Sequence, residues 1–172
     1  MALTYTKIAS FTLTGNQSTI DFTSIPATYT HLCFKLNLDG TGYNATTAYI
    51  NYNGSSASEY TYKNTLKDGN TTTVTNDTVT ASPEFIVIMG SGTNSTANAF
   101  GPNEKFILNY AAAHHKHSTM EFGTETATND KWVGRFEGWW TNTAAINRVT
   151  FTAVSANWST GSTGILYGIL QA

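Results

Sequence analysis

The chain has 172 residues, a length that suits one domain with one hydrophobic core. Hydrophobic residues make up 40% and aromatic residues 13%, which is enough for such a core, whereas charged residues make up only 12%. The polar surface therefore depends on Thr, Ser and Asn, and the β-branched Thr suits strands better than helices. This composition argues against an all-helical fold and predicts a single domain spanning residues 1–172.

The formal net charge is −2, and the chain offers no basic field that would hold phosphates, so we expect no nucleic-acid partner. No stretch approaches the roughly 20 apolar residues of a membrane-spanning helix, and the N-terminus lacks the pattern of a signal peptide. We therefore expect cytoplasmic synthesis and no membrane partner. Cys33 is the single cysteine, so an intrachain disulfide does not contribute to stability.

Alternation of apolar and polar residues predicts strands along the chain, beginning with residues 4–13 and 19–23. The clearest strand covers residues 29–38, where Leu32 and Phe34 share one face with the leucines that follow them. Further strands are expected at residues 46–52, 60–66, 105–113, 118–123, 131–140 and 146–154.

Gly-, Asn- and Asp-rich turns separate these stretches, a spacing that is typical of a sandwich or a barrel. We predict an all-β jelly-roll sandwich of about 8–10 antiparallel strands. One core is expected to contain Leu32, Phe34, Leu36, Phe136, Phe151 and Leu166.

Two segments, residues 85–89 and 165–170, are apolar on both faces instead of alternating. In a two-layer sandwich, such a strand is covered on its outer side by a loop or by a second subunit. Both alternatives stay open at this point. We expect residues 165–170 to be central in their sheet, because a frayed C-terminal strand would expose Leu170 to water.

Residues 67–82 are so rich in Thr, Asn and Asp that we expect an exposed excursion there. Residues 108–113 contain three alanines but no helix N-cap, so a strand that continues into a hairpin is the favoured interpretation over a helix.

His114, His115 and His117 form the most conspicuous polar cluster. In a strand, His115 and His117 would point to the same side and would be able to share a metal ion. Further ligands are missing from the pattern, however, and the intervening Lys116 adds charge. We therefore favour a solvated hairpin tip and expect neither a metal nor another cofactor, while the role of the cluster stays open.

No pattern of an enzyme is present. The acidic residues are scattered without a pair suited to general acid and base catalysis, and the sequence lacks nucleophile-elbow and phosphate-loop motifs. Cys33 has His31 two residues away on the same face, which we interpret as a thiol and an imidazole side by side on a sheet surface. We expect a protein that is not an enzyme.

Residues 132–140 form the strand with the most aromatic residues. A period of two places Phe136 and Trp140 on one face, which we assign to the core, and Trp139 on the other. Trp139 would then pack on a neighbour or stack on a sugar ring, with Asn142 and Asn147 as hydrogen-bonding neighbours. The candidate interface or glycan contacts are Trp139 and Tyr43.

Both ends of the chain carry longer motifs. Residues 8–14 read Ile-Ala-Ser-Phe-Thr-Leu-Thr, and residues 18–32 include Ser-Ile-Pro-Ala-Thr-Tyr-Thr-His-Leu. Residues 142–151 read Asn-Thr-Ala-Ala-Ile-Asn-Arg-Val-Thr-Phe, and residues 157–169 end in Gly-Ile-Leu-Tyr-Gly-Ile. The chain resembles, over nearly its whole length, a group of small jelly-roll structural proteins of tailed bacteriophages.

This resemblance implies a β-sandwich that forms a homotrimer and is displayed on the virion. It implies either a capsid decoration (cement) protein, whose partner is the major capsid protein, or a tail-fibre or host-recognition module that binds carbohydrate. The first strand is expected by about residue 4, with no shaft-forming segment ahead of it, which favours decoration of the head. A bound glycan has no independent support in the sequence.

Overall fold

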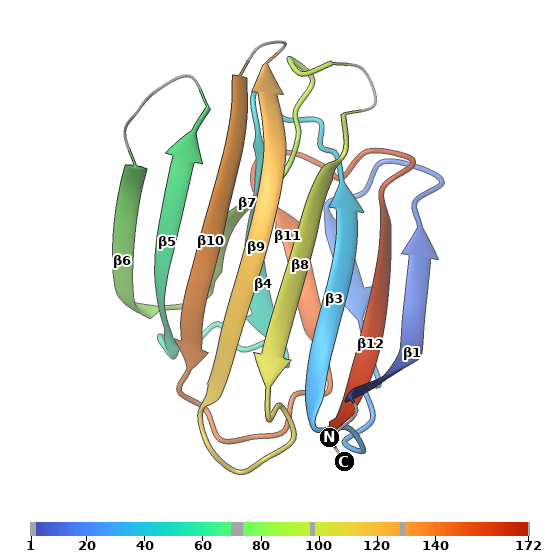
Figure 1. Ribbon diagram of the computed structural model, residues 1–172, viewed down its shortest axis with the longest axis vertical. Helices are drawn as coiled ribbons and strands as arrows, with labels where there is room; N and C mark the ends of the chain where they lie inside the picture. Colours follow the sequence, from blue (N-terminus) through green and yellow to red (C-terminus); the bar gives the residue numbers. More distant parts are fainter. Residues whose placement is uncertain (1–2, 70–73, 97–98, 128–129, 172) are drawn as a thin grey trace.

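The computed structural model describes residues 3–69, 74–96, 99–127 and 130–171, and these residues form twelve strands (Figure 1). In chain order they are β1 (Leu3–Thr12), β2 (Thr19–Phe22), β3 (His31–Leu38), β4 (Thr46–Tyr52), β5 (Tyr60–Asp68), β6 (Val74–Ser82), β7 (Phe85–Gly90), β8 (Gly101–Leu108), β9 (Lys116–Ala127), β10 (Asp130–Trp140), β11 (Val149–Ala153) and β12 (Thr163–Gln171). Within the described ranges, no helix is long and apolar enough to cross a membrane.

The strands form two antiparallel sheets, which confirms the predicted jelly-roll β-sandwich. The larger sheet has the order β1-β12-β3-β8-β9-β10-β5-β6, and the smaller has the order β2-β11-β4-β7. In Figure 1 the eight-stranded sheet faces the viewer and the four-stranded sheet lies behind it. The smaller sheet therefore covers one face of the larger sheet. The other face is called the outer face below, and no second layer formed by the described residues covers it.

The core lies between the sheets and contains all six residues that the alternation predicts. Aromatic rings join the two layers: the ring centroids of Phe34 on β3 and Phe151 on β11 lie 5.6 Å apart, edge to face. Phe136 on β10 meets Phe85 on β7 in the same way at 4.9 Å. Edge-to-face pairs of this kind add to the free energy gained by burying the rings.

Two glycines of β12 leave room for rings that cross the strand. A Cβ at Gly168 would overlap the ring of Tyr29, and a Cβ at Gly164 would overlap the ring of Phe11. The Leu-Tyr-Gly-Ile motif is therefore a packing motif, because any larger residue at Gly168 would displace Tyr29.

The described residues form twelve strands, where about 8–10 were expected, and the largest differences in strand bounds lie at two places. The predicted excursion at residues 67–82 is wrong for residues 74–82, which form β6 at the edge of the larger sheet. Nearly all of its side chains are exposed, so β6 lacks the apolar face that reveals other strands. The strand predicted at 105–113 begins earlier and ends at Leu108, and the alanines that follow lie in the turns of the β8–β9 hairpin.

The two strands that are apolar on both faces have different explanations. β7 is an edge strand of the smaller sheet, and its outward Ile86 and Ile88 still pack against the core cluster. The Asn64 side chain of β5 also donates a hydrogen bond to the Ile86 carbonyl, at 2.9 Å. β12, in contrast, lies between β1 and β3, as expected for a strand inside its sheet, and no segment of the described residues crosses its outer side (Figure 1).

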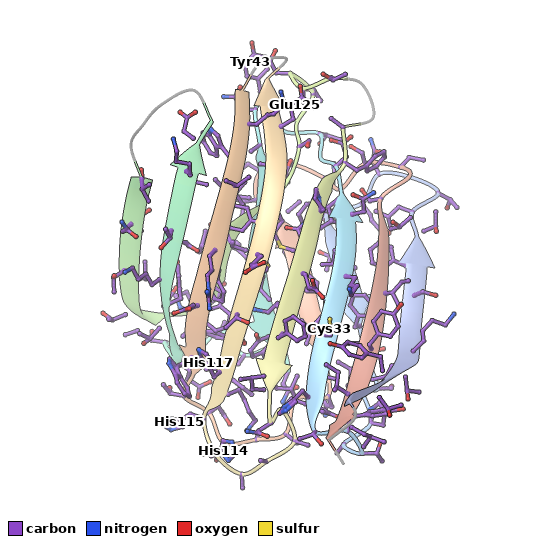
Figure 2. The ribbon with its side chains drawn as sticks, in the orientation of Figure 1. Cys33, Tyr43, His114, His115, His117 and Glu125 are labelled. Carbon is purple, nitrogen blue, oxygen red and sulfur yellow. The ribbon has the colours of Figure 1, made fainter. Side chains whose placement is uncertain are left out.

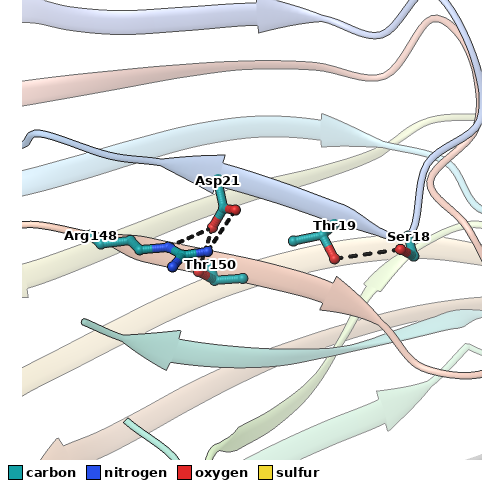
Figure 3. A network of polar contacts seen from close by, with 5 residues as sticks. All are labelled: Ser18, Thr19, Asp21, Arg148 and Thr150. Atoms are coloured by element: carbon teal, nitrogen blue, oxygen red, sulfur yellow. Dashed lines mark hydrogen bonds and ion pairs between the residues drawn. The ribbon is translucent and has the colours of Figure 1, made fainter. Parts of the chain in front are cut away.

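An ion pair fixes the start of β11 against β2 on the outside of the smaller sheet (Figure 3). Arg148 donates two hydrogen bonds to the Asp21 carboxylate, at 3.1 and 2.8 Å, and the Thr150 hydroxyl donates a third. Partial burial disfavours the charge of Asp21, but these hydrogen bonds outweigh it and lower the pKa of the carboxyl. The arrangement closes an edge of the sheet and does not form a binding site.

Lys105 is the least expected member of the interior. It points from β8 into the core, where it is fully buried, and its Nζ has no hydrogen-bond partner in the described structure. The Nζ lies 4.7 Å from the ring centroid of Phe136, 5.1 Å from that of Phe85 and 5.7 Å from that of Tyr52. The rings offset only part of the lost hydration, and burial lowers the pKa of Lys105 to about 7.

Lys105→Met tests this burial, because it removes the amine at nearly constant volume. Above about pH 7 the folded chain holds Lys105 neutral, whereas the unfolded chain keeps its proton up to about pH 10.5. The unfolded state thus binds more protons over this interval, and wild-type stability rises with pH. We expect Lys105→Met to be the more stable protein below pH 7 and to lack this rise, as measured by urea unfolding at several pH values.

The matched control is Lys63→Met, which removes an exposed lysine from β5 and should keep the wild-type pH dependence. If the stability of Lys105→Met rose with pH as it does in the wild type, this result would contradict a buried lysine with a lowered pKa.

Candidate functional site

The candidate site is the outer face of the eight-stranded sheet. Because Leu32, Phe34 and Leu166 enter the core, the residues between them on β3 and β12 face outward. The strand register aligns these outward residues in rows that run across the sheet. One row reads Lys7, Tyr167, Cys33, Phe106, Thr119, Glu137 and Lys63.

An apolar patch occupies the part of this face nearest the chain termini, over β1, β12, β3 and β8. It consists of Tyr5, Phe106, Leu108 and Tyr167, which surround the buried side chain of Ile169, and is called the apolar patch below. The rings of Tyr5 and Tyr167 meet edge to face, with centroids 6.0 Å apart. Tyr5 is 45% exposed, and no described segment covers the patch (Figure 1).

Strand β8 shows most directly that the outer face is apolar here. Its Lys105 points into the core, whereas Phe106 and Leu108 point outward. A shift of one residue would exchange these positions and place the lysine in water. The observed register instead places two large apolar side chains on the outer face.

Cys33 lies on β3, between Tyr167 and Phe106 of the apolar patch in the strand register, and Figure 2 labels its position on the larger sheet. Its side chain faces outward but is fully buried by its neighbours, and its thiol donates a hydrogen bond to Glu104 Oε1 at 3.6 Å. Burial, together with the Glu104 carboxylate, raises the pKa of the thiol to about 12. His31 instead accepts a hydrogen bond from the Asn109 backbone at 3.0 Å. His31 and Cys33 share one face of β3, as predicted, but each group has its own partner, and the thiol is covered by neighbouring side chains.

A groove of about 930 Å³ occupies the other half of the outer face and crosses six strands, from β1 to β10. It is called the groove below. Ser10, Thr12, Asn37 and Thr163 contribute polar groups to its lining, and Pro102, Val133 and Ile165 contribute apolar surface.

Charged side chains stand in the middle of the groove. Lys35 Nζ lies 3.1 Å from Glu104 Oε1, and Glu104 is paired in register with Glu121 on β9. Glu121 is exposed and makes no ion pair in the described structure, because its other neighbour Arg135 pairs with Glu137 at 2.7 Å. The groove thus presents one amine and two carboxylates, one more negative than positive group.

Trp139 lies on the outer face of β10, as the period of two predicts, and is 48% exposed. Its ring stacks on His117 of β9 with centroids 4.6 Å apart. Of the two expected hydrogen-bonding neighbours, the Asn142 side chain is engaged elsewhere, because it donates to Glu59 Oε1 and accepts from the Ala144 backbone. The backbone N–H of Asn147 donates to Asn53 Oδ1.

Tyr43 and Trp139 do not form one site. Tyr43 is 73% exposed in the loop between β3 and β4, at one end of the molecule. Figure 2 shows it at the top, whereas His117, the register partner of Trp139, lies near the bottom.

The histidine cluster is divided between a loop and a strand. His114 and His115 are exposed in the β8–β9 hairpin loop, which matches the predicted hairpin tip, and His117 is already part of β9 (Figure 2). His115 and His117 therefore do not continue one strand face. Among the described residues, no group of three or more His, Cys, Asp or Glu side chains is placed to hold a metal ion.

Lys116 organises this loop. Its side chain turns inward and is fully buried, and Nζ donates hydrogen bonds to the carbonyls of Ala112, His114 and Thr143. Burial lowers the pKa of Lys116. The amine that the sequence suggested would repel a metal thus has a structural role.

Comparisons with known proteins supply no family. No family model matches the sequence, and no curated protein matches it. Among solved structures, the fold is similar to the crystal structure of Caenorhabditis elegans galectin LEC-6, with a TM-score of 0.36 and 9% sequence identity over 94% of this chain and 96% of that chain. A similarity this low carries no argument about function.

The groove residues were not evident from the sequence. Glu104 and Glu121 are seventeen positions apart in the chain, and they become neighbours only through the register of a hairpin with a long loop. The outward position of Phe106 was hidden as well, because it lies in an expected strand next to a lysine that the pattern would place in water.

Lys116→Met tests the organisation of the hairpin loop. The variant leaves three carbonyls without their donor, and unsatisfied buried polar groups cost about 1–3 kcal/mol each. We expect a lower urea midpoint and faster hydrogen exchange in residues 109–115. Lys131→Met, at an exposed position on β10, is the control and should leave both unchanged. If hydrogen exchange in this loop were as slow in Lys116→Met as in the wild type, the amine would not be what stabilises the loop.

Proposed function

We propose that this chain is a structural protein of a tailed-bacteriophage virion: a homotrimeric capsid decoration protein that binds the major capsid protein on the outer head surface and stabilises the shell. The apolar patch is the observation that carries the proposal. The sequence resemblance to phage jelly-roll structural proteins supports it, and no catalytic role is proposed.

The patch bears on the question that the sequence left open about residues 165–170. A strand with two apolar faces needs a loop or a second subunit above it, and no loop of the described structure covers β12. Contiguous apolar surface of this kind marks an interaction site. A second copy of the chain is the occupant that we propose, because association in a closed ring buries the same patch on every subunit.

Decoration requires a broad surface with many weak contacts. A trimer that touches several neighbouring capsid subunits binds by multivalency, and it stabilises the assembled shell because it binds that state in preference to the open one. The Thr-rich surface of low charge suits a particle that remains folded outside its host. A host-recognition module is the alternative function.

The oligomeric state is the first test. Light scattering should give about three times the 18.6 kDa mass of the chain. The double variant Tyr5→Glu with Leu108→Glu places charges in the patch and should give a monomer with an unchanged circular dichroism spectrum. Its control, Thr61→Glu with Thr78→Glu, changes the same outer face over β5 and β6 and should stay trimeric. If the wild type were monomeric, or if the patch variant stayed trimeric, the apolar patch would not be the subunit contact.

The second test uses particles that lack this protein. Without a decoration protein, they should adsorb to cells normally but release their genome at a lower temperature, because the shell has lost its bridging contacts. The measurement is dye-detected genome release during heating, with adsorption counted in parallel. Normal heat stability with lost adsorption would favour the host-recognition alternative instead.

A further inference from the structure

The groove is the second surface of the outer face, and the proposal for it does not depend on the proposed virion role. We propose that it binds an extended, uncharged oligosaccharide across the strands of the outer face. The proposal rests on the dimensions of the groove, on the polar groups that line it and on its charge.

The dimensions suit a linear chain of sugars. The lining residues come from six adjacent strands, which at about 4.8 Å spacing span about 24 Å. The volume of about 930 Å³ lies in the range of small-molecule sites. A groove that crosses the strands offers each successive sugar ring the side chains of the next strand.

The lining provides both kinds of contact that a sugar makes. Ser10, Thr12, Asn37 and Thr163 can donate and accept hydrogen bonds from hydroxyl groups. Pro102, Val133 and Ile165 offer apolar surface to the C–H face of a ring, and Val133 is 56% exposed.

The charged groups in the middle are placed as hydroxyl ligands. Lys35 and Glu104 hold each other at 3.1 Å, and the Cys33 thiol donates to the same Glu104 oxygen from below. These contacts fix the donor and the acceptor before any ligand arrives, which lowers the entropic cost of binding. Glu121 makes no ion pair in the described structure, so its carboxylate is free to accept hydrogen bonds from adjacent hydroxyls.

The charge of the groove selects against polyanions. Glu104 and Glu121 outnumber Lys35, so nucleic acid, an acidic polysaccharide or an anionic lipid surface would meet net repulsion. The apolar patch adjoins the groove on β8, where Phe106 of the patch lines a small hollow together with Glu104 and Glu121.

Gly123 permits a direct test. It lies in the lining on β9, and a Cβ at this position would have no neighbour closer than 3.9 Å. The Cβ of Gly123→Trp therefore meets no clash, the indole ring enters the groove, and tryptophan is well tolerated in strands. Thr78→Trp, at an exposed outward position on β6, adds the same side chain outside the groove.

The experiment applies the purified full chain to an array of neutral and acidic glycans and measures affinities for the linear neutral hexasaccharides of glucose. We expect a neutral oligosaccharide to bind, with at least a tenfold loss in Gly123→Trp and in Glu121→Ala. Thr78→Trp and Trp139→Ala should bind as the wild type does.

Absence of binding to every neutral glycan, or wild-type affinity in Gly123→Trp, would overturn the proposal. Loss of binding in Trp139→Ala alone would move the site to the Trp139–His117 stack. Oligomeric mass and genome release remain separate measurements, so failure of the groove proposal is distinguishable from failure of the proposed function.

Discussion

The register of β8 is the constraint on which both the core and the outer face depend. It places Lys105 among the rings of Phe136 and Phe85, where burial of an amine is unfavourable, and directs Phe106 and Leu108 outward, where apolar groups meet water. Each placement costs free energy in an isolated chain. The register is fixed on both sides, because β3 and β9 pair with β8 along its length.

The unequal sizes of the two sheets also leave the outer face uncovered by the described residues. Four strands suffice to cover the core, but eight strands present an outer face that no other described layer covers. That face is divided between the apolar patch near the termini and the groove with its charged centre. We propose a protein partner for the patch and an oligosaccharide for the groove.

The sequence predicts the fold well where alternation reports burial. Along β3, apolar residues at every second position identify the core, and all six core residues named from the sequence lie in it. The sequence does not predict strand β6, because the side chains of this exposed edge strand do not alternate between apolar and polar. It also does not predict the burial of Cys33, which depends on side chains from neighbouring strands that no local pattern specifies.

The candidate site was harder to predict than the fold, because it also depends on side chains from neighbouring strands. Trp139 was assigned correctly to the outer face, but its stacking partner His117 comes from another strand. Glu104 and Glu121 meet only through the pairing of β8 with β9, and Lys35 joins them from β3. Local periodicity gives the direction of a side chain, whereas a site requires the register of several strands at once.

The central claim is that the outer face of the larger sheet is the working surface of the protein. Hydroxyl-radical footprinting of the wild-type protein at low and high concentration tests it directly, with mass spectrometry of the oxidised residues. We predict that Tyr5 and Tyr167 on the outer face become protected as subunits associate, while Tyr49, on the outside of the smaller sheet, keeps its reactivity. Protection of Tyr49 with unchanged oxidation of Tyr5 and Tyr167 would contradict the claim.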